Sequence, residues 1–215
     1  ILFNSPALLD INYQYHNILI EDTWHSSDWK VWRIRFRDGV RFHNSAPLTA
    51  RDVEFSIKKR IEAGSSRYSA IRELSIVNDR ELLLRLDLPI YDISDLMDVL
   101  VYPAKLFKAD EPWRKTLLKN PIGSGPFRFK GWLNKGMELT ANDDYFEGRP
   151  KIDKVLCFYE ENEDRKLNLL LKGEADLLSP VSPKAARFLE RDSRFYVTKT
   201  TTPFYAAIFL NNKSP

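Results

Sequence analysis

The stretch NPIGSGPFRFKGW, residues 120–132, decides how the chain is divided, because it combines a dense group of turn residues with the start of a strand. Two glycines and two prolines lie within a few positions and predict a fixed turn: Pro121, Gly123, Gly125 and Pro126. From Phe127 onward, apolar and polar residues alternate with the period of two that is typical of a strand. The stretch is therefore predicted to be a turn that leads into a strand.

The chain changes character at this turn. Before it, the pattern predicts hairpin-like strands and short helices, and after it strands and helices alternate. We therefore predict two subdomains, Ile1–Leu118 and Lys119–Pro215, with the principal sheet in the second. Its strands are expected near Phe127, Leu139, Val155, Leu177, Val197 and Ile208. The alternation indicates a mixed sheet flanked by helices, in the α/β class and bordering on α+β, with a smaller strand-rich subdomain beside it.

The clearest predicted helix covers residues 50–62. Thr49 is a good N-cap with Asp52 three residues later, and Gly64 follows the last turn. Val53, Ile57 and Ile61 repeat every four residues and are expected on one apolar face. Other helices are predicted at 92–100, 163–172 and 185–191, and other strands at 40–43, 75–77, 81–86, 137–141, 152–160, 175–178 and 195–200.

The segment Lys30–Arg37 has two interpretations. Apolar Trp32, Ile34 and Phe36 alternate with three arginines, so one face of a strand is apolar and the other carries guanidinium groups. Interleaved basic and aromatic residues occur in nucleic-acid-binding strands. A half-buried strand with a solvated face is the simpler interpretation, because the next turn and helix are acidic as well as basic.

Composition indicates a folded globular protein. The 215 residues are 43% hydrophobic and 29% charged, and 33 basic against 30 acidic residues give a net charge of +3. This near balance gives little support for a nucleic-acid partner. The chain opens without a signal-peptide pattern and contains no apolar run long enough to span a bilayer. It begins inside an apolar segment, so we expect a fragment whose targeting segment lies outside it.

Few residues favour catalysis or metal binding. His16, His25 and His43 lack metal-ligand spacing, and the single cysteine, Cys157, lies in an apolar run where a buried small hydrophobe is expected. Gly123-Ser124-Gly125 resembles the start of a phosphate loop, but no Gly-Lys-Ser/Thr follows and Pro126 removes a backbone donor. We therefore expect no enzyme activity, no cofactor and no metal site.

Several motifs together resemble the bacterial extracellular solute-binding proteins of family 5, the oligopeptide-, dipeptide- and nickel-binding proteins of ABC importers. They occur in the family's order along almost the whole chain. The motifs are RFRDGVRFH (35–43), PLTARDVEFSI (47–57), PIGSGPFRF (121–129), Asn142 with Tyr145-Phe146, GRPKIDKV (148–155), Arg165 and GEADL (173–177). One departure is Asn44-Ser45, where the family commonly has Asp-Gly in a turn.

The resemblance implies a lobe of a two-lobed periplasmic-binding-protein fold, without its first strand. Asn211-Asn212 resembles the crossing into a second lobe and is expected to act as a hinge. Such a protein captures a solute, here a peptide or another small solute, between its lobes and delivers it to a membrane permease. It is expected in the periplasm or outside the cell, and as a monomer at full length. The alternative is the ligand-sensing domain of a transcriptional regulator built on the same fold.

Ligand-binding residues are predicted from the expected sheet. Ligands usually meet an α/β sheet at loops that follow strand ends, so Ser179, Pro180 and Val181, after the predicted strand at 175–178, are the main candidates. Tyr102, after a predicted helix, and Tyr205, near the crossing, are further candidates, although each tyrosine also fits a core or surface aromatic. A single lobe is expected to bind its solute too weakly to measure.

Overall fold

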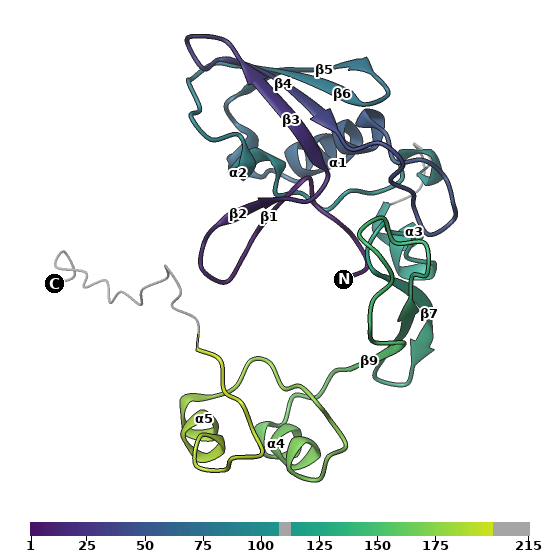
Figure 1. The fold of residues 1–215 in the computed structure, drawn as a ribbon, viewed down its shortest axis with the longest axis vertical. Helices are drawn as coiled ribbons and strands as arrows, with labels where there is room; N and C mark the ends of the chain where they lie inside the picture. The colour runs from purple at the N-terminus through teal and green to yellow at the C-terminus, as the bar shows by residue number, and fades with distance from the viewer. Residues whose placement is uncertain (108–112, 200–215) are drawn as a thin grey trace, which may run out of the picture. The chain divides into compact units, whose positions relative to one another are not determined.

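The computed structural model describes residues 1–107 and 113–199. The chain forms two compact units, Ile1–Tyr159 and Glu160–Pro215. Figure 1 shows the described elements of each unit. The predicted subdomain boundary at Leu118 lies within the first unit and stays a prediction.

The largest sheet of the first unit has four antiparallel strands in the order β3-β4-β6-β5. They are β3 (Ile20–His25), β4 (Val31–Phe36), β5 (Ile71–Asn78) and β6 (Glu81–Leu86). Strand β4 follows its alternating sequence: Trp32, Ile34 and Phe36 are buried. On the opposite face, Arg33 and Arg35 both form ion pairs with the carboxylate of Glu81. The two arginines thus share one carboxylate partner within the sheet, which fits the simpler interpretation.

Helix α1 (Ala50–Glu62) contacts β5 and β6 and has the predicted bounds. Its start is fixed by a capping box in which the Asp52 carboxylate accepts hydrogen bonds from the Thr49 backbone and hydroxyl, both at 2.8 Å. Val53 and Ile57 are fully buried, each stabilising the fold by about 1.5–3 kcal/mol. Ile61 is 43% exposed, so the buried stripe ends before the last turn.

Short elements complete the region up to residue 119. The hairpin of β1 (Ala7–Leu9) and β2 (Tyr15–Asn17) contacts α2 (Ser94–Met97). The other short elements are η1 (Ser66–Tyr68), η2 (Ala104–Leu106) and α3 (Trp113–Lys119). The return strand predicted at 40–43 is wrong: only an isolated bridge joins Arg41 and Pro47.

A second sheet of the first unit consists of antiparallel strands in the order β7-β8-β9. They are β7 (Phe127–Leu133), β8 (Gly136–Ala141) and β9 (Lys154–Phe158). Free Cys157, on β9, is partly buried. The predicted turn at 121–126 precedes β7 and packs on the start of the chain, because the Gly125 N–H donates to the Leu2 carbonyl at 2.9 Å. A Cβ atom at Gly123 would lie 1.9 Å from that carbonyl oxygen. The backbone of Leu2 therefore fills the space that a phosphate loop would leave open.

His43 ties this turn to the rest of the first unit. Its Nδ1 accepts a hydrogen bond from the Gly123 N–H at 3.2 Å, so Nε2 carries the proton and donates to the Gly125 carbonyl at 3.0 Å. The Asn4 side-chain amide donates to the Ser124 carbonyl at 2.9 Å. Burial lowers the pKa of the His43 imidazole below its usual value.

The second unit contains α4 (Glu163–Leu171) and α5 (Pro183–Leu189), capped by the side chains of Asn162 and Ser182. The strands predicted at 175–178 and 195–200 are wrong: the described residues of both segments form no strand. Leu177, near which a strand was predicted, is 84% exposed, and Val197 is partly buried in an irregular segment. A short apolar run therefore predicted strands that the structure does not have. The strand predicted near Ile208 lies outside the described residues.

Candidate functional site

A polar pocket of about 400 Å³ lies in the first unit and is a candidate for a binding site. It gathers side chains from the N-terminal segment, the end of α1, η1 and the segment after α2. The lining residues are Ser5, Arg60, Ser65, Arg67, Tyr68, Asp98 and Leu100. Its volume is within the range of small-molecule sites.

The end of α1 places the first wall of the pocket. Gly64 has φ +78°, in the left-handed region that commonly ends a helix. The Ser65 N–H then donates back to the Arg60 carbonyl at 3.1 Å, and η1 follows directly. This turn brings the ring of Tyr68, which is only 4% exposed, beside the last turn of α1.

Buried polar groups of α1 position the opposite wall. Ser56 Oγ accepts a hydrogen bond from the Tyr102 N–H at 2.9 Å, and Asp52 Oδ1 accepts one from the Ala104 N–H at 2.8 Å. The Val101 N–H donates to the Asn4 carbonyl at 2.9 Å. These bonds hold the segment after α2 next to the N-terminal residues, so that Leu100 and Ser5 line one pocket.

The two arginines of the pocket differ in their partners. Arg67 forms ion pairs with Asp95 at 3.8 Å and with Asp98 at 3.5 Å. Arg60 forms none with a carboxylate of the described residues. Burial raises the pKa of the Tyr68 phenol, and the positive charges of Arg67 and Arg60 oppose that rise.

Tyr102, a predicted ligand-binding residue, lies beside this pocket and does not line it. It is 7% exposed and packs edge-on against Phe3, with ring centroids 5.2 Å apart. Burial raises the pKa of the Tyr102 phenol, and the charge of Arg60 opposes that rise. The structure therefore gives Tyr102 the environment of a core aromatic at the edge of the pocket.

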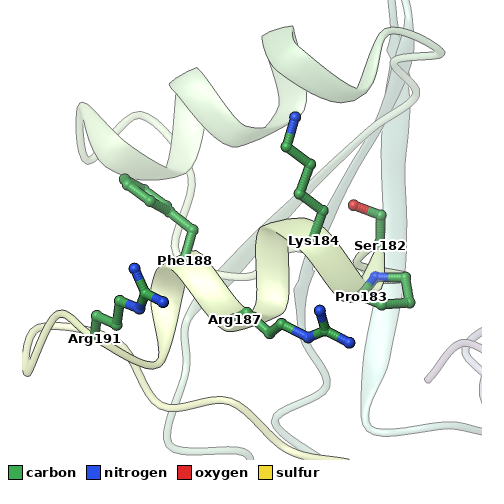
Figure 2. A pocket seen from close by; sticks show the side chains of 6 residues that line it. All are labelled: Ser182, Pro183, Lys184, Arg187, Phe188 and Arg191. Carbon is green, nitrogen blue, oxygen red and sulfur yellow. The ribbon is translucent and has the colours of Figure 1, made fainter.

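The predicted loop Ser179–Val181 lies in the second unit, immediately before α5. Ser179 and Pro180 are exposed and Val181 is partly buried. A hollow of about 580 Å³ begins at the next residue, lined by Ser182, Pro183, Lys184, Arg187, Phe188 and Arg191 (Figure 2). Three of these six side chains are cationic and belong to no ion pair within the described part of the chain. The hollow is lined by residues of α5 and by Ser182 and Arg191 on either side of it, and Phe188 is 53% exposed.

The remaining predicted site residues, Tyr205 and the hinge pair Asn211 and Asn212, lie outside the described residues. Sequence reasoning missed Ser5, Arg60 and Tyr68. The only local signal was the polar run that follows Gly64, and nothing in it indicated that residues near 5 and 98 lie opposite.

Within 1–107 and 113–199, no three His, Cys, Asp or Glu side chains cluster in a way that could hold a metal ion. None of the helices described is long and apolar enough to cross a membrane.

Comparison with known proteins identifies the family. Residues 14–215 match the family described as bacterial extracellular solute-binding proteins, family 5, middle region. This match covers most of the chain, so the chain belongs to the family 5 solute-binding proteins.

The chain is also similar to particular members. It is 35% identical over 139 residues to the oligopeptide-binding protein AppA of Bacillus subtilis, covering 58% of this chain and 25% of that protein. It is 25% identical over 220 residues to a probable di/tripeptide-binding protein of Pseudomonas aeruginosa, covering 88% of this chain and 41% of that one. The chain thus spans less than half the length of these two relatives.

Solved structures confirm the fold class. The structure of Bacillus subtilis AppA with a nonapeptide matches with a TM-score of 0.70 and 27% identity, over 80% of this chain and 37% of that one. NikZ of Campylobacter jejuni, solved with Ni(L-His), matches with a TM-score of 0.78 and 23% identity, over 90% of this chain and 40% of that one. The predicted periplasmic-binding-protein-like lobe of helices and sheets is confirmed.

Proposed function

We propose that this chain is part of the solute-binding component of a bacterial ABC importer and that its solute is a peptide. The observation that carries the proposal is the family match over residues 14–215. The polar pocket of the first unit supports it, because its hydroxyls and charged groups are of the kind that orient a small polar ligand. The family consists of binding proteins, and we propose that this member likewise catalyses no reaction.

The proposed mechanism is closure of two lobes on the solute. A ligand that binds the closed form more tightly than the open form shifts the protein toward closure by that difference in affinity. The permease then recognises the closed shape. In this proposal Asn211 and Asn212 form part of the hinge, and the subdomains Ile1–Leu118 and Lys119–Pro215 together form one lobe.

We propose that Ser179, Pro180, Val181 and Tyr205 contact the solute. Tyr102 stays a further candidate ligand-binding residue, with an almost fully buried ring. The protein acts in the periplasm or outside the cell, as a monomer, next to its membrane permease and without a nucleic-acid partner. The pairing of Arg33 and Arg35 with Glu81 supports this last point, because both arginines already contact a carboxylate of the sheet.

The test is calorimetric titration of the full-length protein with a library of di-, tri- and longer peptides. Saturable binding of at least one length class is expected. A protein that binds no peptide would contradict the proposal. Alanine at Ser179 and at Tyr205 tests the site, and unchanged affinity in both variants would contradict their assignment.

A further inference from the structure

The polar pocket of the first unit contains one cation without an acidic partner. Arg67 is held by Asp95 and Asp98, and the Arg67 Nη1 also donates to the Asp98 carbonyl oxygen at 3.2 Å. Arg60 lines the same pocket without an ion pair to any described carboxylate.

Three residues that line the pocket carry hydroxyl groups. The side chains of Ser5, Ser65 and Tyr68 donate no hydrogen bond to another described residue. Ser5 is 3% exposed and Tyr68 is 4% exposed, so both are fixed by packing. Among the described residues, two side-chain oxygens are fully buried without a hydrogen-bond partner, those of Thr116 and Ser124. The hydroxyl oxygens of Ser5, Ser65 and Tyr68 are not among these atoms.

These groups share one chemistry. A guanidinium and three hydroxyls can all donate hydrogen bonds, and a carboxylate is an acceptor with two oxygens that pairs well with a guanidinium. The one acid of the lining, Asp98, shares Arg67 with Asp95, so Arg60 and Arg67 together balance two carboxylates. The pocket therefore offers a guanidinium without a direct carboxylate partner among the described residues and carries no net negative charge.

We propose that this pocket binds a carboxylate group of the solute, with Arg60 as its ionic partner and Ser5, Ser65 and Tyr68 as hydrogen-bond donors. The proposal rests on the proposed solute-binding function and adds a selection for anionic solutes. The carboxylate belongs either to the C-terminus of a peptide or to an Asp or Glu side chain. Both sources present the same group to the pocket, and the ligands of the test separate them.

The test uses the full-length protein and two pairs of peptides that differ only in charge. Trialanine is compared with trialanine amide, and Ala-Glu-Ala amide with Ala-Gln-Ala amide. We expect the unmodified protein to prefer the carboxylate in at least one pair, by roughly 10- to 100-fold, as a hydrogen-bonded ion pair provides. The pair that shows the preference identifies the source of the carboxylate.

The variants are Arg60→Gln, Tyr68→Phe and the control Arg51→Gln. Arg51 is an exposed arginine of the same helix and does not line the pocket. Arg60→Gln should abolish the preference and Tyr68→Phe should reduce it, whereas Arg51→Gln should keep it. Circular dichroism melting checks that each variant is folded. No preference in either pair, or a preference that survives Arg60→Gln, would overturn the proposal.

A smaller probe separates this inference from the proposed function. Binding of N-acetylalanine and of its amide is measured by NMR saturation transfer on the same proteins. If no peptide binds, the proposed function fails, but binding of N-acetylalanine that Arg60→Gln removes would still uphold the carboxylate pocket. Equal signals for the acid and the amide would overturn it.

Discussion

At the scale of single residues, Gly123 and Gly125 are required because the backbone of Ile1 and Leu2 packs directly against them. The sequence predicted a fixed turn from its glycines and prolines. It did not indicate that the first residues of the chain pack onto Gly123 and Gly125, because that contact joins segments about 120 positions apart. The need for glycine is therefore explained only by the structure.

Gly125→Ala should destabilise the first unit. A Cβ atom there would lie 2.3 Å from the Ile1 carbonyl oxygen, so the N-terminal segment must move away. We expect a loss of about 1–3 kcal/mol in the free energy of unfolding, measured by chemical denaturation. Gly131→Ala is the matched control, because nothing lies within 4 Å of its added Cβ. Equal stability of the two variants would contradict the packing described.

Ser45→Gly should stabilise the protein. Ser45 has φ +65°, in the left-handed region that costs a residue with a Cβ atom about 1–2 kcal/mol, whereas the family commonly has glycine in this turn. The greater entropy of glycine in the unfolded chain offsets part of the gain. We expect a net gain of about 0.5–1 kcal/mol by denaturant titration. The same substitution at Ser69, where φ is −62°, should destabilise instead.

His43 should make the stability of the first unit depend on pH. Its pKa is lowered in the folded protein, so below the usual value of 6.5 the unfolded chain takes up a proton before the folded chain does. The contribution of His43 to the free energy of unfolding is therefore fully present above pH 6.5, and it is lost as the pH drops toward the lower pKa of the folded protein. Protonation of Nδ1 would also remove the hydrogen bond from Gly123.

The measurement for His43 is chemical denaturation at about pH 7.5 and about pH 5.5. The unmodified protein should lose more stability between these two values than His43→Gln does. An identical loss in both proteins would show that another group causes the pH dependence.

At the scale of elements, local signals were most reliable where a whole helix repeats one pattern. Helix α1 was predicted with its observed bounds, because its cap, its apolar spacing and its terminal glycine agree. The strands predicted at 175–178 and 195–200 rested on short apolar runs alone. Short runs fit a strand, a buried helix segment or an irregular loop equally well, and tertiary contacts decide between them.

Ser56→Ala should weaken the link between α1 and the segment that carries Tyr102. The Ser56 side chain is fully buried, and its hydroxyl accepts a hydrogen bond from the Tyr102 N–H, which the substitution would remove. We expect the free energy of unfolding to fall by about 1–3 kcal/mol. Ser66→Ala, at an exposed serine of η1, should change it little. Similar effects at both positions would contradict this role of Ser56.

At the scale of the whole molecule, the sequence predicted the family and the class of fold but not the pocket. Family motifs are local and can be recognised in order along the chain. The pocket joins residues near positions 5, 60, 68 and 98, which only the packed structure brings together. Tyr102 was predicted from its place after a helix, and the structure sets it at the edge of that pocket. The assignments of Ser179, Pro180, Val181 and Tyr205 stay predictions.

The two-lobe mechanism also predicts how binding depends on chain length. A site enclosed from both sides excludes water around the solute. A single lobe leaves the solute half solvated, while association still costs about 4–15 kcal/mol of lost translational and rotational freedom. The 215-residue chain alone should therefore bind far more weakly than a full-length protein that contains it.

The most direct test is calorimetric titration of the same peptides into the 215-residue chain and into the full-length protein under identical conditions. We predict saturable binding to the full-length protein and no measurable heat of binding to the shorter chain. Circular dichroism establishes that the shorter chain is folded. Equal affinities would show that this chain carries the whole site and would contradict capture of the solute between two lobes.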